Sequence, residues 1–244
     1  KKLFKKECVR CGLKVPQDFC VSIPMSEEEL TAVKYPVIVK PADNGGRKGI
    51  SVCNSKTELL EAIRIAEEYS LTGEVVVEEY LIGSELCAVY TISDGNISLS
   101  CLNDKYVSQD GSEMAQLCDF VVTPSKYYEK YLKEVDASVK TLLRRIGAKN
   151  GVANFQFIAA ADGITAFEMG YRINGNNDYK VAEKYNNINF MKMLISYSLT
   201  GDMGDSIEKD NAAFSEYYCT YVVHLKPGTV GTVNYGKLYE HKKM

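Results

Sequence analysis

Several patterns that mark common functional classes are missing from this sequence of 244 residues. No apolar run approaches the ~20 residues that a membrane-spanning helix needs, and no signal peptide is visible, so we expect no membrane contact. Lysine and arginine number 29 against 32 acidic residues, and without a basic excess nothing points to nucleic acid. Neither GxxxxGK[ST] nor a GxGxxG after a strand occurs, which argues against a P-loop or a Rossmann site.

Zinc-binding spacing is also missing, although eight cysteines are present. Cys8 and Cys11 form a CxxC pair, but no second pair stands at zinc spacing, and the segment has the pattern of a helix. A half-buried helical face therefore explains this pair better than a metal or redox site. Most of the cysteines lie in apolar stretches, as reduced core cysteines do, and reduced thiols favour a cytoplasmic protein.

What the sequence does contain is an ordinary globular composition, with 45% hydrophobic and 25% charged residues. A chain of this length can form one large domain or two small lobes around a sizeable core. The first residue is Lys1 rather than Met, and a helical pattern begins at once. We therefore expect the chain to be a piece of a longer protein.

Helix and strand patterns predict two α+β lobes with antiparallel sheets, which meet near Glu79–Leu81. Two capping boxes, Ser26 with Glu29 and Ser55 with Glu58, mark helix starts. The first half predicts helices at 1–12, 26–35 and 55–69, and strands at 18–23, 37–40, 50–53, 74–83, 85–93 and 97–102. The second half predicts a polar loop at 103–116, a strand at 118–124, a long helix at 126–146, a hairpin at 152–169, a helix at 187–202 and late strands at 217–225 and 229–233.

A lysine at a strand end is followed by a glycine-rich loop in the first half. Lys40 ends the strand, and the loop runs from Asp43 to Gly49. Glycines let backbone amides approach phosphate oxygens, and a lysine at the rim adds a positive charge. An ordinary strand-end lysine explains this stretch equally well, so the loop alone indicates a phosphate site only weakly.

Two carboxylates follow the next apolar strand, at the expected crossing between the lobes. Glu78 and Glu79 come directly after three valines, Leu81 follows, and Glu85 opens another strand. Carboxylates and backbone groups suit the amino group of adenine and the hydroxyls of ribose. The alternative is a solvated strand end, which remains open for Glu78 and Glu79.

The predicted hairpin brings two oxygen donors together. If its turn is the three residues Ala161-Asp162-Gly163, Gln156 falls directly opposite Glu168, with Cβ atoms ~4.5–5.5 Å apart. That separation suits two ligands of one Mg²⁺ ion, which also takes phosphate oxygens. A two-residue Asp-Gly turn would put the two side chains on opposite faces. A polar pair on an open sheet face is the competing explanation, which Arg172 and the following asparagines make weaker.

These motifs, in this order, resemble the ATP-grasp superfamily, and specifically the branch that contains carbamoyl-phosphate synthetase large chain and biotin carboxylase. The matching stretches are "VIVKP" with its glycine loop, "VEEYLIGSE" and "NFQF…FEMGYRINGNN" followed by a helix. The resemblance implies an α+β fold in which two lobes with antiparallel sheets clasp ATP. It divides the chain into a linking helix (1–14), a small lobe with the glycine-rich lid (15–80) and a large lobe with the metal site (81–244).

The resemblance also implies roles for single residues. Arg172 and Lys40 are the catalytic cations, Gln156 and Glu168 hold Mg²⁺ or Mn²⁺, and Asn176 is a loose candidate for the substrate side. The implied ATP-binding residues are Lys1 (with Lys2 as second choice), Lys40, Gly45, Gly46, Gly49, Glu78, Glu79, Leu81 and Glu85.

The implied reaction is the ATP-dependent joining of a carboxylate to an amine through an acyl phosphate, with release of ADP. It needs no histidine base, which fits a chain whose only histidines are His224 and His241. The alternatives are a nucleotide-binding module that has lost turnover and a subunit of an ADP-forming acyl-CoA ligase. A homo-oligomer also remains open.

Two departures from the family pattern matter. Gly170 stands where the family usually has a further asparagine ligand, so one metal site is weakened or Asn174 or water substitutes. The domain that precedes the linking helix in the family is missing from this sequence. Because that domain carries much of the acceptor site, we expect this piece to bind ATP yet turn over little.

Overall fold

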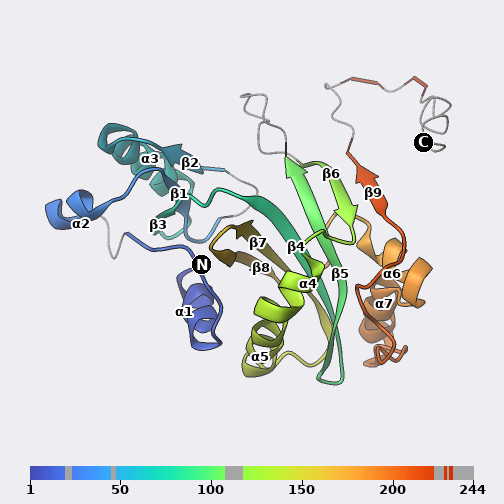
Figure 1. Cartoon of the computed structure of the whole chain (residues 1–244). Helices are drawn as coiled ribbons and strands as arrows, with labels where there is room; N and C mark the ends of the chain where they lie inside the picture. Colours follow the sequence, from blue (N-terminus) through green and yellow to red (C-terminus); the bar gives the residue numbers. More distant parts are fainter. Residues whose placement is uncertain (20–23, 45–47, 108–117, 223–227, 230, 233–244) are drawn as a thin grey trace.

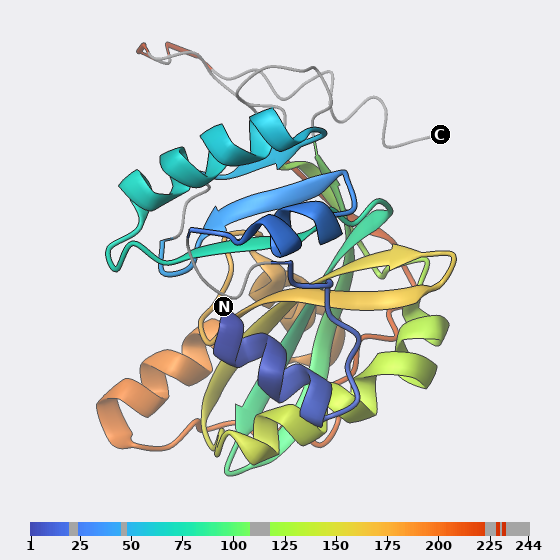
Figure 2. The ribbon, with the colours of Figure 1, turned by 90° about the vertical axis from the view of Figure 1, so that its left-hand side faces the viewer.

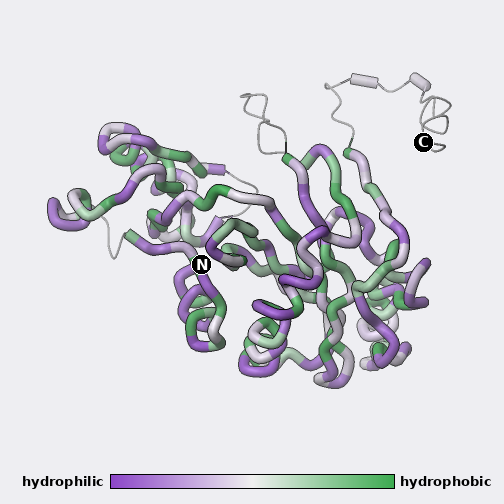
Figure 3. Tube along the Cα trace, viewed as in Figure 1, coloured by the Kyte–Doolittle hydropathy of each residue, from purple (hydrophilic) through white to green (hydrophobic). Residues whose placement is uncertain are grey.

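The computed structural model describes residues 1–19, 24–44, 48–107, 118–222, 228–229 and 231–232. These residues form two antiparallel sheets with flanking helices, which confirms the expected α+β class (Figure 1). Short hydrophobic and hydrophilic segments alternate along the chain (Figure 3). Across the described ranges, no helix has both the length and the apolar character that crossing a bilayer requires.

The small sheet has three strands in the order β2-β1-β3. Val37 and Val39 of β1 and Val77 of β3 point into one core with Leu59 and Ala66 of α3, because alternate strand residues share a face. The opposite face of β1 therefore carries Lys40. The elements of this part are α2 (Glu27–Ala32), β1 (Val37–Pro41), β2 (Ser51–Cys53), α3 (Lys56–Tyr69) and β3 (Val75–Glu79).

The large sheet has six strands in the order β8-β7-β4-β5-β6-β9. Its long central hairpin, β4 with β5, turns at Asp94 and Gly95, which both have positive φ. The strands are β4 (Ser84–Ser93), β5 (Asn96–Val107), β6 (Cys118–Thr123), β7 (Gly151–Ala160), β8 (Gly163–Gly170) and β9 (Tyr218–Tyr221).

Helices cover both faces of the large sheet. On β4, Leu86, Ala88 and Tyr90 face one core, whereas Cys87 and Val89 face the other. The first core is covered by α1 (Lys2–Arg10), α4 (Tyr128–Tyr131), the π-helical turn η1 (Leu132–Asp136) and α5 (Ala137–Arg145). The second is covered by α6 (Asp178–Asn186) and α7 (Phe190–Thr200). Figure 2 shows α1 below the small sheet and beside α5.

The segment after α1 joins the two sheets. Lys14 pairs with Thr165 of β8 in the large sheet, and four residues later Asp18 pairs with Glu78 of β3 in the small sheet. The backbone N–H of Phe19 then donates to the carbonyl of Val77 at 2.8 Å. This short stretch therefore fixes the small sheet relative to the large one.

The register of the β7–β8 hairpin confirms one prediction and corrects another. Gln156 lies opposite Glu168, as predicted, but Ala160 pairs with Gly163, so the turn has two residues rather than three. The register shifts between Gln156 and Phe157, because Phe167 is an extra residue on β8. A β-bulge inserts one residue into one strand, and it restores the alignment that a two-residue turn alone would have destroyed.

Other predictions from the sequence were correct only in part. Both helix caps form, since the side chains of Ser26 and Ser55 accept the expected N–H groups. The polar loop at 103–116 was wrong at its start, because β5 continues to Val107 and pairs there with β6. The long helix at 126–146 is interrupted by the π-helical turn. Residues 20–23 and much of the two predicted late strands lie outside the described residues. The described part of the first late strand contains β9.

The aromatic centre of the large core gives a direct test of the fold. Phe155 is 0% exposed and packs against Tyr90 edge-on, with ring centroids 5.9 Å apart. Replacing Phe155 by alanine is expected to lower the free energy of unfolding by about 3–5 kcal/mol, measured by urea denaturation. The Leu71→Ala change is the control, because Leu71 is 88% exposed and should cost no more than about 0.5 kcal/mol. A small effect of Phe155→Ala would contradict this packing.

Candidate functional site

A cavity of about 830 Å³ lies between the two sheets and brings most of the predicted residues together. Its walls come from α1, the face of the small sheet that points away from α3, the crossing segment and the ends of the strands β4, β5, β7 and β8. The predicted residues that line it are Lys1, Lys40, Glu78, Glu79, Leu81, Glu85, Gln156, Glu168 and Arg172. A second hollow of about 810 Å³ lies at the far end of the β4–β5 hairpin and contains none of them.

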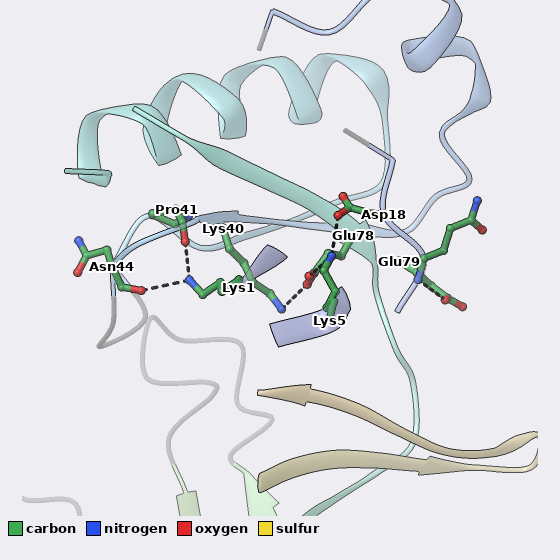
Figure 4. Close-up of polar contacts among 9 residues, drawn as sticks. Lys1, Lys5, Asp18, Lys40, Pro41, Asn44, Glu78 and Glu79 are labelled. Carbon is green, nitrogen blue, oxygen red and sulfur yellow. Dashed lines mark hydrogen bonds and ion pairs between the residues drawn. The ribbon is translucent and has the colours of Figure 1, made fainter. Parts of the chain in front are cut away.

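The side chain of Lys40 is held by a buried carboxylate. Its Nζ donates to Oε2 of Glu78 at 2.8 Å, and Lys5 Nζ contacts Oε1 of the same group at 2.7 Å (Figure 4). Burial of the Glu78 carboxyl favours a raised pKa, but Lys40 and Lys5 outweigh it and leave the pKa below its usual value. Glu78 is therefore a charged, paired group and not a solvated strand end.

Lys1 reaches the same corner of the cavity from α1. Its Nζ donates to the carbonyl oxygens of Pro41 and, at 3.1 Å, Asn44, at the start of the glycine-rich loop (Figure 4). Burial and the neighbouring Lys40 lower the pKa of the Lys1 ammonium. Two cationic side chains thus converge on one place, where an anion would offset their mutual repulsion. The side chain of Lys2, the second choice, is exposed and does not line the cavity.

The base of the glycine-rich loop is tied to the end of α3. The Asp43 carboxylate accepts from Ser70 Oγ at 2.8 Å and from the N–H of Thr72 at 2.8 Å, and these bonds lower its pKa to about 2. Gly49 has φ +71, and a Cβ there would lie 2.8 Å from the Cβ of Tyr69, so only glycine fits. The predicted lid residues Gly45 and Gly46 lie outside the described residues.

The crossing between the sheets runs along one wall of the cavity. The Glu79 carboxylate accepts from the N–H of Gln17 at 3.3 Å, and Leu81 follows in the open segment before β4. Glu85 forms an ion pair with Lys105, which lies directly opposite on β5. Carboxylate side chains and the open backbone of the crossing segment therefore line this wall of the cavity.

Gln156 and Glu168 face the cavity from adjacent strands. Among the described residues, neither side chain hydrogen-bonds to another protein group, so both keep their oxygens available. Lys40 reaches across from the small sheet, with its Nζ 5.8 Å from the centre of the Phe167 ring, next to Glu168. Two opposed oxygen donors beside a lysine fit the ligand set of a hard divalent cation such as Mg²⁺.

No larger ligand cluster supplements this pair. Within the described part of the chain, no group of three or more His, Cys, Asp and Glu side chains gathers in a way that could hold a metal ion. The remaining ligands of such an ion would have to be phosphate oxygens and water, as is common for Mg²⁺.

Gly170 has a close neighbour on β7. Asn154 lies opposite it, and its Nδ2 donates to the carbonyls of Gly170 at 3.1 Å and Arg172 at 2.6 Å. A Cβ at position 170 would lie 3.3 Å from that nitrogen, closer than most real contacts. An amide from β7 thus fastens the chain that leads into Arg172, whose Nη1 contacts its own neighbour, the Ile173 carbonyl.

The asparagines after Arg172 fold back on the sheet. Asn174 Nδ2 donates to Asp178 Oδ2 at 2.6 Å, while its Oδ1 accepts from the N–H of Asn176 at 3.2 Å. Asn176 in turn offers its backbone carbonyl to Thr220 on β9. The side chain of Asn174 is therefore engaged in holding this segment. Asp178 ends the polar cluster that begins at Arg172 in the sequence, but no role was predicted for it; the structure buries it at the start of α6.

Known proteins share this architecture. The biotin carboxylase domain of the 2-oxoglutarate carboxylase from Hydrogenobacter thermophilus, solved in complex with MgADP, superimposes with a TM-score of 0.71 at 20% identity, covering 88% of this chain and 48% of that one. The carbamoyl phosphate synthase large chain of Archaeoglobus fulgidus is 25% identical over 91% of this chain. The D-alanine–D-alanine ligase of Fusobacterium nucleatum is 28% identical over 60% of it.

The fold and the cavity between its sheets define a protein of the ATP-grasp class, as the resemblance in the sequence predicted. The family model described as D-ala D-ala ligase C-terminus matches residues 16–146, more than half of the chain. The chain belongs to this family of ATP-grasp ligases. It spans only 21% of the Archaeoglobus protein and 47% of the Fusobacterium ligase.

The buried carboxyl of Asp178 gives a prediction for pH. Burial raises its pKa to about 6, against the opposing effect of hydrogen bonds such as that from Asn174. The folded state therefore holds this proton more tightly than the unfolded state, so stability from this group is full below about pH 4 and is lost as pH rises to about 6. As the pH is raised from 4 to 7.5, the free energy of unfolding of Asp178→Asn should therefore increase by on the order of 2–3 kcal/mol relative to that of the parent protein.

Urea denaturation at several pH values measures this difference. Asp205→Asn is the matched control, because it makes the same replacement at an exposed position, without the burial that acts on Asp178. If the difference in free energy of unfolding between the parent protein and Asp178→Asn did not change with pH, the interpretation of Asp178 as a buried acid would be wrong.

Proposed function

We propose that this chain binds Mg-ATP between its two sheets and forms the ATP-grasp part of an ADP-forming ligase that joins a carboxylate to an amine. The observation that carries this proposal is the pair Gln156 and Glu168, opposed in register by the bulge at Phe167 and facing Lys40 across the cavity. The division into a linking helix (1–14), a small lobe (15–80) and a large lobe (81–244) follows the two sheets and is part of the proposal.

The nucleotide would lie along the cavity with its phosphates toward Lys1 and Lys40. The crossing segment at Glu79–Leu81 would hold adenine largely through backbone groups, and Glu85 would accept from a ribose hydroxyl. Gln156 and Glu168 would hold Mg²⁺, which when bound would neutralise negative charge on the phosphate oxygens. The MgADP bound to the Hydrogenobacter biotin carboxylase domain, which has the same fold, supports this choice of ligand.

The reaction that fits these groups proceeds in two steps. A substrate carboxylate oxygen attacks the γ-phosphorus of ATP, and the bond to the leaving ADP oxygen breaks, giving an acyl phosphate. An amine then attacks the acyl carbon, phosphate leaves with the C–O electron pair, and the amine gives up a proton. Lys40 and Arg172 would act by holding and neutralising the phosphoryl oxygens, so positioning and charge supply most of the catalysis.

Acceptor-dependent turnover tests the reaction. Because this chain spans less than half the length of the Archaeoglobus and Fusobacterium relatives, the intact protein should be used, with Mg-ATP and a panel of amino acids and small carboxylates. Release of ADP and phosphate should rise several-fold with the right acceptor. Tight ATP binding with no ADP formed under any condition would instead favour a nucleotide-binding module that has lost turnover.

The metal pair can be tested by binding alone. Glu168→Ala and Gln156→Ala should each weaken the affinity for ADP in the presence of Mg²⁺ at least about tenfold, about 1.4 kcal/mol, because each removes an oxygen ligand. Affinity measured with EDTA should change little. Calorimetric titration with and without Mg²⁺ gives both numbers.

Glu208→Gln is the control for these variants. Glu208 is exposed and lines the other hollow, at the far end of the β4–β5 hairpin, so its replacement should leave both affinities unchanged. An equal loss with and without Mg²⁺ in the Glu168 and Gln156 variants would argue against a metal at this pair.

A further inference from the structure

One carboxylate in the cavity wall serves two lysines from different elements. Glu78 of β3 contacts Lys40 of β1 through Oε2 at 2.8 Å and Lys5 of α1 through Oε1 at 2.7 Å (Figure 4). Lys5 also contacts Asp18 at 2.8 Å. Lys40 lines the cavity, whereas Lys5 does not, so Lys5 reaches the site only through Glu78.

Two of the three groups lie away from water. Glu78 is 2% exposed and Lys5 is 6% exposed, which is unusual for charged residues, whereas Lys40 is half-buried at the cavity wall. A buried carboxylate without a partner is strongly unfavourable, so Glu78 needs at least one cation at all times. With two cations present, either one can move away and the Glu78 carboxylate still keeps a partner.

This arrangement bears on how Lys40 can bind a phosphate. As long as its ammonium is held by Glu78, it is only partly available to another anion. If Lys40 turns toward a phosphate oxygen, Glu78 loses one of its two partners, and Lys5 is then the remaining cation within contact distance. Lys5 is placed to keep that partner role, because it is anchored on the other side by Asp18 and by helix α1.

We propose that Lys5 is a positioning residue that neutralises Glu78 and thereby frees Lys40 to bind the nucleotide phosphates. This inference rests on the proposed function, since it takes Lys40 as a phosphate ligand. It adds a role for a residue that does not touch the nucleotide.

The proposal predicts that the effect of Lys5 depends on the charge of Glu78. In Lys5→Met, Glu78 has Lys40 as its one remaining cation, and the affinity for Mg-ATP should fall at least about tenfold. In a Glu78→Gln background position 78 carries no charge that could lose its partner, so adding Lys5→Met should change the affinity by no more than about twofold. A purely structural role of Lys5 would give a similar loss in both backgrounds.

The experiment is a double-mutant cycle by calorimetry, with the parent protein, Lys5→Met, Glu78→Gln and the double variant. Adenosine is titrated beside Mg-ATP, because it lacks the phosphates and its affinity should not respond to Lys5→Met. Lys6→Met is the matched control, since Lys6 is the exposed neighbour on the same helix and its loss should have no effect.

Each outcome decides a different point. If the parent protein binds no Mg-ATP, the proposed function itself fails. If it binds, and Lys5→Met binds equally well or loses affinity for adenosine to the same degree, this inference alone is overturned. If Lys5→Met does not fold, the double variant is compared with Glu78→Gln in its place. An affinity of the double variant for Mg-ATP tenfold weaker than that of Glu78→Gln would overturn the inference, whereas equal affinities would support it.

Discussion

The buried carboxylate of Glu78 is the constraint around which the site is arranged. It lies in the small sheet, yet one of its two cations, Lys5, comes from α1, a helix packed on the large sheet. An unpaired charge in that position would be costly, so α1, β1 and β3 are held in one relative arrangement. The neighbouring stretch from Lys14 to Phe19, which pairs with strands of both sheets, reinforces it.

The two walls of the cavity carry different chemistry as a result. The small sheet and α1 supply ammonium groups, Lys40 and Lys1, whereas the large sheet supplies oxygen donors, Gln156 and Glu168. A polyanion with its divalent cation can lie between them with each charge opposed. Asn154 secures the end of β8, and through two carbonyl contacts it fixes the chain from which Arg172 enters the same space.

The hairpin shows how a correct pairing can follow from an incorrect turn. Spacing of twelve residues between Gln156 and Glu168, together with the chemistry expected of them, predicted that they oppose each other. The turn that produces this alignment was predicted with three residues, but it has two, and the bulge at Phe167 makes up the difference. A bulge has no strong local signature, because it is stabilised by the packing of both strands and not by the residue that is inserted.

The sequence by itself determined the elements and the residue types of the site. Capping residues predicted helix starts, short apolar runs predicted β1 and β3, and the ordered motifs indicated the class of fold. Only the tertiary structure decided which charges meet. That Lys5, Glu78 and Lys40 share one buried contact, and that Asp178 is buried beneath Asn174, depends on elements far apart in the chain. Local pattern cannot report such contacts, because desolvation of a charged group is set by what packs over it and not by its neighbours in sequence.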